Sequence, residues 1–244
     1  MSDQAKGPER PGGTRIGRTL RDPDRYGALL LLIVCTLVMQ AVTGESKLLR
    51  LIAVGLQVLV LVFAIKTSRP GHTYVRVVSV IAGAAVLAGV ALMFLAADRF
   101  GLASINAASV VLLVGVIFAI GRRLTTHREI TGSTIAGAVC IYLLLGMTFA
   151  SVDAVLAALD TAPFFSQGTD GTSLDRLYFS FVTLTTVGYG DYTAHGGLGR
   201  MIAVTEALMG QLYLVTVLAL LVSNIGRSRN HGIPLEEPED GSEG

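Results

Sequence analysis

Residues 186–191 read Thr-Val-Gly-Tyr-Gly-Asp, and this hexapeptide decides how the C-terminal part of the chain folds. Gly188 and Gly190 have no Cβ, so both can adopt positive φ angles that other residues rarely adopt. Such residues let successive carbonyl groups point the same way, whereas an ordinary extended run alternates them. The hexapeptide therefore predicts a loop that presents a column of backbone carbonyl oxygens, with the side chains of Val187 and Tyr189 turned away from that column.

The composition of the chain is typical of a membrane protein. Its 244 residues are 52% hydrophobic and 15% charged, with a mean hydropathy of +0.62, whereas about 25% of the residues of a soluble domain are charged. The net charge of +1 and the lack of a basic patch interleaved with aromatics give no support for nucleic-acid binding. Cys35 and Cys140 both lie in apolar runs, which favours small buried side chains over metal ligands or a disulfide.

Six apolar stretches have roughly the 17–25 residues that a helix needs to cross a hydrocarbon core. They cover residues 26–43, 48–65, 77–97, 102–121, 134–158 and 198–225. Backbone polar groups must be satisfied internally in lipid, and a helix achieves this within one segment. The sequence therefore predicts an all-α membrane protein with six transmembrane helices.

A shorter apolar segment, residues 174–185, lies between the fifth and sixth stretches and leads directly into the hexapeptide. It is too short to span a bilayer, and non-helical backbone at membrane depth must be covered by protein or line a water-filled cavity. We therefore expect a re-entrant helix followed by a re-entrant loop. Thr172 and Asp175 have the spacing of a capping box, which predicts a helix start just after Ser173.

The order of helix, short helix, Thr-Val-Gly-Tyr-Gly-Asp loop and helix resembles the pore module of the potassium channel family, over about residues 134–229. The resemblance implies a K⁺-selective channel. In that family the backbone carbonyls of such a loop replace the hydration shell of K⁺. Carried over to this chain, the ion-binding residues are Thr186, Val187, Gly188 and Tyr189, with the Gly190 carbonyl at the mouth.

One loop covers only one side of an ion, and the chain holds one copy of the motif. A closed ring of carbonyls therefore implies a homotetramer around a shared axis. The expected partners are K⁺, the lipid bilayer and three further copies of the chain, with no cofactor besides the permeant ion. An enzyme is not expected, since the histidines show no metal-ligand spacing: His72, His127, His195 and His231.

The resemblance also assigns residues around the loop. Asp191 is expected at the outer mouth, and Tyr178 and Phe179 occupy positions where relatives carry tryptophans that brace the loop tyrosine. Glu206 is ionisable within an apolar stretch, which favours support of the pore helix, with a proton-sensing gate as the alternative. Gly210 lies 19 residues beyond Asp191, where a hinge is expected, and close helix packing is an equal alternative.

The distribution of basic residues predicts the topology. If the N-terminus is cytoplasmic, fourteen of the 19 Lys and Arg residues lie on that side, and the other side holds Lys47, Arg50, Arg99, Arg176 and Arg200. This fits the positive-inside rule and places both termini in the cytoplasm. The expected parts are a disordered N-terminus (1–25), a four-helix membrane domain (26–123), a linker (124–133), a pore domain (134–226) and a disordered acidic tail (227–244). The compact organisation favours a prokaryotic plasma membrane.

The first four helices resemble a voltage sensor in number and position only. A sensing helix needs several basic residues at intervals of three, yet residues 105–121 contain none, and Arg122 and Arg123 are interpreted as topology anchors. We therefore predict conduction without steep voltage dependence. Two alternatives remain open from sequence: a weakly selective cation channel, and a non-conducting membrane subunit that keeps the pore fold.

Overall fold

The computed structural model describes residues 24–42, 46–68, 72–95, 99–126 and 132–229. These residues form α1 (Asp24–Val42), α2 (Lys47–Ser68), α3 (His72–Leu95), α4 (Arg99–Thr126), α5 (Gly132–Leu159), α6 (Ser173–Leu184) and α7 (Gly196–Arg229). Within the described ranges the extended backbone is limited to isolated bridges at Phe165, and no strand forms. The predicted all-α class is confirmed.

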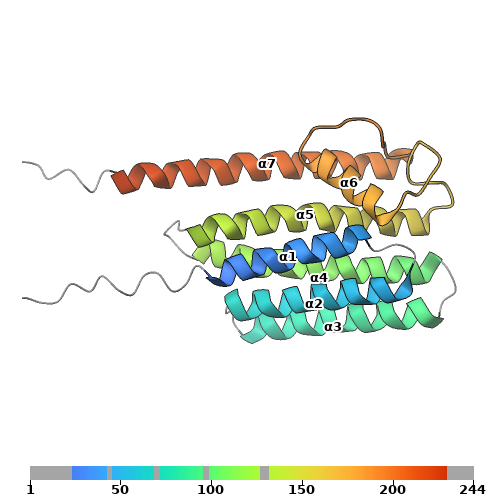
Figure 1. Ribbon diagram of the computed structural model, residues 1–244, viewed down its shortest axis with the longest axis horizontal. Helices are drawn as coiled ribbons and strands as arrows, with labels where there is room; N and C mark the ends of the chain where they lie inside the picture. Colours follow the sequence, from blue (N-terminus) through green and yellow to red (C-terminus); the bar gives the residue numbers. More distant parts are fainter. Residues whose placement is uncertain (1–23, 43–45, 69–71, 96–98, 127–131, 230–244) are drawn as a thin grey trace, which may run out of the picture.

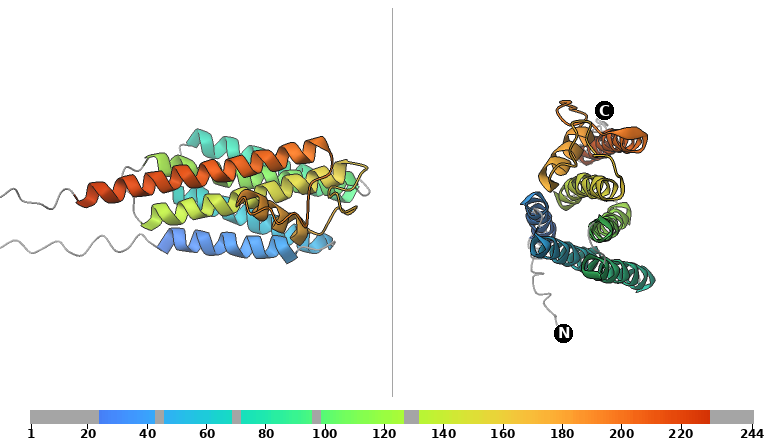
Figure 2. Two further views of the ribbon diagram at one scale, coloured as in Figure 1. Left: turned by 90° about the horizontal axis from the view of Figure 1, so that it is seen from above. Right: turned by 90° about the vertical axis from the view of Figure 1, so that its right-hand side faces the viewer.

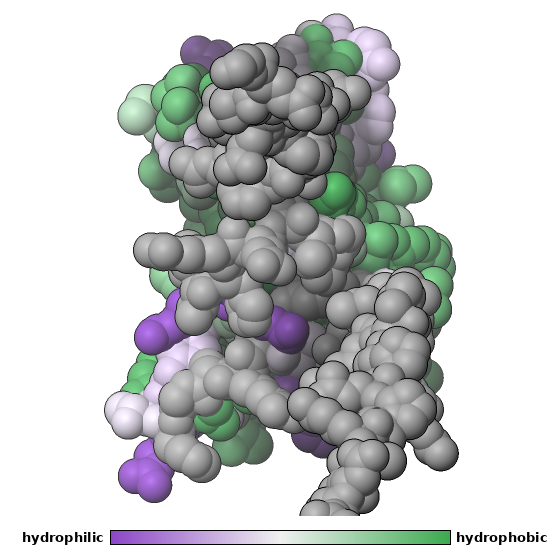
Figure 3. Space-filling model, turned by 90° about the vertical axis from the view of Figure 1, so that its left-hand side faces the viewer, coloured by the Kyte–Doolittle hydropathy of each residue, from purple (hydrophilic) through white to green (hydrophobic). Residues whose placement is uncertain are grey.

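Four of the helices in the described part of the chain are long and apolar enough to cross a membrane. Their spanning segments are Lys47–Thr67, Thr73–Leu95, Arg99–Leu124 and Thr134–Leu159, and the apolar part of α1, Gly27–Val42, is shorter. Apolar side chains such as Leu59 of α2 and Leu87 of α3 are exposed, as a lipid-facing surface requires. Seen from one end, hydrophobic residues are visible at the sides of the molecule (Figure 3). The chain is thus a multi-pass membrane protein.

The long helices run alongside one another, and α6 with its following loop lies at one end of α7 (Figure 1). Seen end-on, α6 and α7 form one edge of the molecule, α2 and α3 form the opposite edge, and α5 lies between them (Figure 2). The helix α4 packs against α2, α3 and α5, and α5 in turn packs against α1, α6 and α7. The hexapeptide is therefore carried by the edge of the molecule that is remote from α2 and α3.

The buried core joins α1, α4 and α5 through aliphatic side chains such as Ile33, Leu112 and Leu144, which are at most 1% exposed. Lipid tails are as apolar as these side chains, so close packing, and not transfer out of water, holds such helices together. Small residues permit that packing at Gly89 of α3, whose added Cβ would lie 3.1 Å from the Cβ of Ala108 on α4.

The helix bounds differ from the sequence prediction mainly where polar residues extend a helix beyond its apolar stretch. The third helix begins at His72 and not at residue 77, and the fourth continues to Thr126 and not to 121. Hydropathy does not register these ends because polar residues there continue the helix at the bilayer surface. The predicted N-terminal region lies almost wholly outside the described residues, as does most of the predicted acidic tail.

Candidate functional site

The short helix α6 begins with the predicted capping box. Thr172 is the N-cap, its Oγ1 accepts a hydrogen bond from the Asp175 backbone N–H at 3.2 Å, and Asp175 Oδ2 accepts one from the Thr172 backbone N–H at 2.7 Å. The Thr172 backbone N–H is the main reason why the pKa of Asp175 is lowered. These reciprocal bonds fix the start of the helix, which ends at Leu184.

The C-terminal end of α6 is fitted between α5 and α7 by two glycines. A Cβ added to Gly146 of α5 would lie 2.7 Å from the Phe181 ring, and one added to Gly210 of α7 would lie 2.1 Å from the Leu184 carbonyl oxygen. The Tyr142 hydroxyl of α5 donates to the same Leu184 carbonyl at 3.4 Å. Gly210 therefore lies at a point of close backbone contact, which is the packing alternative of the sequence analysis.

The loop after α6 alternates its backbone conformation. The φ angles of Thr186, Gly188 and Gly190 are +60°, +56° and +81°, so every second residue of the hexapeptide is left-handed. The backbone N–H groups of Val187 and Gly188 both donate to the Val182 carbonyl, at 3.0 and 3.3 Å. The positive φ of Thr186 was not predicted, and a left-handed conformation costs a non-glycine residue roughly 1–2 kcal/mol. Strain of this kind is typical of functional sites.

Tyr178 on α6 contacts two of the other candidate residues. Its ring stacks nearly parallel to the Tyr189 ring, with centroids 6.4 Å apart and an interplanar angle of 7°. Its hydroxyl donates to Asp191 Oδ2 at 2.8 Å, and Gln167 Nε2 donates to the Asp191 carbonyl at 2.7 Å. Tyr178 thus connects α6 to the last residues of the loop within a single chain.

Phe179 faces the other side of α6. It is 6% exposed and packs edge-to-face on Phe164 and Phe165, at centroid distances of 6.1 and 5.3 Å. Its described aromatic contacts are to this cluster and not to Tyr189 of its own chain. Of the two predicted bracing residues, the structure brings only Tyr178 to the loop within one chain.

Glu206 of α7 is fully buried and meets Ser180 of α6, whose Oγ donates to Glu206 Oε1. The same Ser180 Oγ lies 2.7 Å from the Gly146 carbonyl of α5. A hydroxyl carries one hydrogen, so Ser180 donates to one of these two oxygens at a time. The pair links α5, α6 and α7 at one point behind the loop.

Several residues of this site were not predicted from sequence. Ser180 is fully buried, and Tyr213 of α7 donates to the Ala138 carbonyl at 2.6 Å while its ring stacks on Tyr142 at 5.8 Å. A signal for them exists, because polar groups in apolar helices need a partner when they are buried. That signal identifies a residue that needs a partner but does not say which partner it has.

Comparison with known proteins agrees with this geometry. Residues 137–227, from the start of α5 to the end of α7, match the ion channel family. The region around the loop is therefore an ion channel domain. The chain is 42% identical over 66 residues to the human potassium voltage-gated channel subfamily KQT member 4, covering 27% of this chain and 9% of the relative. Over part of its length the chain is thus similar to ion channels, among them potassium channels.

A bacterial relative is similar over a segment of comparable length. The chain is 42% identical over 77 residues to protein LctB of Bacillus caldotenax, covering 29% of this chain and 57% of the relative. The chain thus matches less than two thirds of the length of either relative.

Proposed function

We propose that this chain is the subunit of a homotetrameric K⁺-selective channel. The carbonyls of residues 186–190 and the Thr186 hydroxyl coordinate K⁺ in single file, and Asp191 lies at the outer mouth. The observation that carries the proposal is the alternation of left-handed residues at Thr186, Gly188 and Gly190. Alternation of this kind turns successive carbonyls toward one side, which is the arrangement that replaces the hydration shell of K⁺.

The single chain leaves this loop open, which supports assembly around a shared axis. The side chains of Val187 and Tyr189, which the sequence analysis expected to turn away from the carbonyl column, are 53% and 71% exposed in the single chain. The exposed apolar residues of α7 continue from the loop at helical spacing: Leu198, Met201, Val204, Leu208, Leu212 and Val215. Neighbouring subunits that covered this stripe would also enclose Val187 and Tyr189.

The proposed topology has six membrane crossings, formed by α1 to α5 and α7, with α6 and its loop re-entrant. Both termini lie in the cytoplasm of a prokaryotic cell. The basic residues favour this orientation by the positive-inside rule. The domain boundaries follow: residues 26–123 form a four-helix membrane domain, residues 134–226 form the pore domain, and residues 124–133 link the two.

The proposed channel has no steep voltage dependence. The described residues of α4 carry no Lys or Arg between Ile105 and Gly121. At the end of that helix, the guanidinium carbon of Arg122 lies 5.2 Å from the Tyr74 ring centroid, and Arg123 donates to the Thr67 carbonyl. One charge that crosses the field contributes about 2.3 kcal/mol per 100 mV. We expect a measured gating charge close to zero, and several charges per channel would contradict this part of the proposal.

The test of selectivity is the reversal potential of the purified protein in a planar bilayer with K⁺ on one side and Na⁺ on the other. We expect a reversal close to the K⁺ equilibrium potential. Gly188→Ala should shift it toward zero, because an L-residue at the +56° φ of this position is strained and the carbonyl column is disturbed. Gly197→Ala is the matched control, since Gly197 lies on α7 outside the loop, and an added Cβ meets nothing within 4 Å.

Two results would overturn the proposal and favour the alternatives. A reversal near zero in the unaltered protein indicates a weakly selective cation channel with a loose loop. Silence in a well-folded tetramer indicates a non-conducting membrane subunit. Equal effects of Gly188→Ala and Gly197→Ala would show that the loop backbone does not set selectivity.

A further inference from the structure

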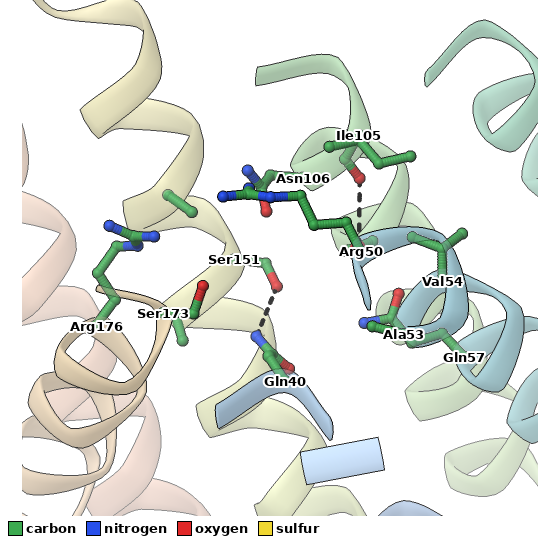
Figure 4. A pocket seen from close by; sticks show the side chains of 13 residues that line it. Gln40, Arg50, Ala53, Val54, Gln57, Ile105, Asn106, Ser151, Ser173 and Arg176 are labelled. Atoms are coloured by element: carbon green, nitrogen blue, oxygen red, sulfur yellow. Dashed lines mark hydrogen bonds between the residues drawn. The ribbon is translucent and has the colours of Figure 1, made fainter. Parts of the chain in front are cut away.

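A small cavity lies between the four-helix part of the molecule and the start of α6, apart from the hexapeptide. Its volume is about 40 Å³, and its wall is formed by residues of α1, α2, α4, α5 and α6. In the view of Figure 4, Arg176 of α6 and Gln57 of α2 lie on opposite sides of the cavity, and Gln40 of α1 lies between them. Each of the five helices contributes at least one polar side chain, and the wall also includes Arg50, Asn106 and Ser151.

Gln57 is a polar residue within the apolar spanning segment of α2. It follows Lys47, the first residue of the helix, by ten residues, or about 15 Å along the helix axis. It is 2% exposed, and its Oε1 has no hydrogen-bond partner in the described structure. Because a buried polar group without a partner is costly, Gln57 indicates that a hydrogen-bond donor occupies the cavity beside it.

Two further polar groups of the wall are incompletely satisfied. Gln40 Nε2 donates to the Met147 carbonyl and to Ser151 Oγ, at 3.3 and 3.2 Å, while the buried Gln40 Oε1 has no partner in the described structure. Arg176 is 9% exposed, and its Nη1 donates to two backbone carbonyls of the preceding loop at 2.7 and 2.8 Å, but its buried Nε has no such partner. The wall therefore contains two acceptors and one donor that need partners.

We propose that the cavity binds a cluster of roughly two or three water molecules, which joins Gln57 and Gln40 to Arg176. Water fits this set because it both donates and accepts, whereas a cation would satisfy only the two amide oxygens and an anion only the guanidinium. The volume fits as well, since a buried water needs about 10–15 Å³. The bound waters would connect α1 and α2 with the first turn of α6. The four-helix part would thereby support the start of the helix that carries the loop, whether or not the chain conducts ions.

The direct test is an experimental density map of the full-length protein at a resolution that shows ordered water. We expect water peaks at hydrogen-bond distance from Gln57 Oε1 and Arg176 Nε. Crystals grown in RbBr distinguish water from an ion, because Rb⁺ and bromide both give an anomalous signal. An anomalous peak in the cavity would overturn the proposal, and so would an ordered cavity without water peaks.

Hydroxyl-radical footprinting provides a second measurement, because radicals formed from bound water oxidise the side chains beside it. Ile105 lines the cavity and is 2% exposed, whereas Leu112 of the same helix is 1% exposed and lies outside the cavity wall. We expect Ile105 to be oxidised several-fold faster than Leu112. Gln57→Leu should reduce this difference. Thr148→Val is the control and should keep it, since Thr148 donates to the Leu144 carbonyl of its own helix outside the cavity.

The melting temperature of Gln57→Leu tests the proposal through its sign. If water satisfies the Gln57 amide, the substitution removes a hydrogen bond and should lower the melting temperature by about 3 °C. In a dry cavity it would remove an unsatisfied polar group, so a higher melting temperature would overturn the proposal. Equal oxidation of Ile105 and Leu112 in the parent protein would do the same. The density map and the parent footprint use the unaltered chain, so the inference stays testable if Gln57→Leu fails to fold.

Discussion

The part of the molecule that comprises α5, α6 and α7, which we call the pore edge, is held together differently from the other edge, which comprises α1 to α4. At the α5–α7 edge, individual atoms fit one another: Ser180 bonds Glu206, and a Cβ at Gly210 would lie 2.1 Å from the Leu184 oxygen. In α1 to α4, an added Cβ would meet nothing within 4 Å at Gly27, Gly55, Gly83 or Gly121. At Gly115 it would make ordinary van der Waals contacts at 3.4 Å, and at Gly89 a closer contact at 3.1 Å. The structure of the pore edge is therefore specified residue by residue, and that of the other edge mainly by apolar volume.

This difference has a physical reason. An apolar helix face can exchange one aliphatic side chain for another with small cost when volume is kept. A loop that must present backbone carbonyls at fixed positions has no such freedom, because its geometry depends on the helix that carries it. Substitutions of the same chemical type should therefore have unequal effects at the two edges.

The largest contrast is expected between two glycine substitutions. Gly210→Ala places a methyl group against the Leu184 carbonyl, so α6 or α7 must shift, at a cost of about 3 kcal/mol or more. Gly83→Ala has open space and removes a poor helix former, so its stability should be unchanged or higher by up to about 1 kcal/mol. The measurement is the melting temperature of each purified protein in the same detergent, followed by K⁺ flux from liposomes.

A Gly210→Ala protein that melts like the parent would contradict the close contact as a structural requirement. If such a protein also showed a lower open probability, the hinge alternative for Gly210 would be favoured over packing. Equal destabilisation by Gly210→Ala and Gly83→Ala would remove the contrast between the two edges altogether.

A smaller contrast is expected between two serine substitutions. Ser180→Ala removes the partner of Glu206, and a buried polar group left without a partner costs about 2 kcal/mol. Ser104→Ala in α4 removes only bonds to the backbone carbonyls of Gly101 and Gly89, at 2.8 and 3.3 Å, so a loss below about 1 kcal/mol is expected. Thermal unfolding of both variants gives the comparison.

A double-mutant cycle shows whether the cost at Ser180 comes through Glu206. Ser180→Ala should destabilise a Glu206→Leu background much less than the parent, because no buried acid then remains to be satisfied. Additive effects of the two substitutions would show that Ser180 stabilises the protein through Gly146 alone. The role of Glu206 in supporting the pore helix would then lose its basis.

The contrast between the edges also explains what sequence reasoning reached. Hydropathy was enough for the order and approximate position of the long helices, because lipid requires apolar spans of a fixed length. It misplaced the start of α3 by five residues, since His72 and Thr73 are polar yet helical. Nothing in the apolar pattern of α2 indicated that Arg50 lines the same cavity as Arg176, because the two residues lie far apart in the chain and share no local motif.

Within the site, features that depend on a few consecutive residues were predicted, whereas contacts between helices were not. The capping box at Thr172 and the positive φ angles of Gly188 and Gly190 were predicted, because each depends on a few consecutive residues. The positive φ of Thr186 and the partner of Glu206 were not predicted, since both depend on how α6 is placed against α5 and α7. Whether the candidate residues conduct K⁺ stays a prediction.

The smallest expected effect concerns the capping box of α6, which depends only on neighbouring residues of the chain. The lowered pKa of Asp175 means that its charged form is favoured in the folded protein, chiefly by the Thr172 backbone N–H. Its contribution should be fully present above the unfolded pKa of about 3.9 and lost as the pH falls through the lower folded value. Because Asp175 is only partly buried, Asp175→Asn should cost only about 0.5 kcal/mol at pH 7.

Melting temperatures of the parent and Asp175→Asn proteins between pH 7 and pH 3 provide the measurement. The difference between the two should be constant down to about pH 5 and should shrink below about pH 4. Asp160→Asn is the control, since Asp160 follows the end of α5 and accepts from Thr161 and Ala162 in the loop, not at a helix start. An equal cost for Asp175→Asn and Ser180→Ala would show that the start of α6 depends on contacts with other helices as much as its middle does. The capping box would then not be a purely local feature.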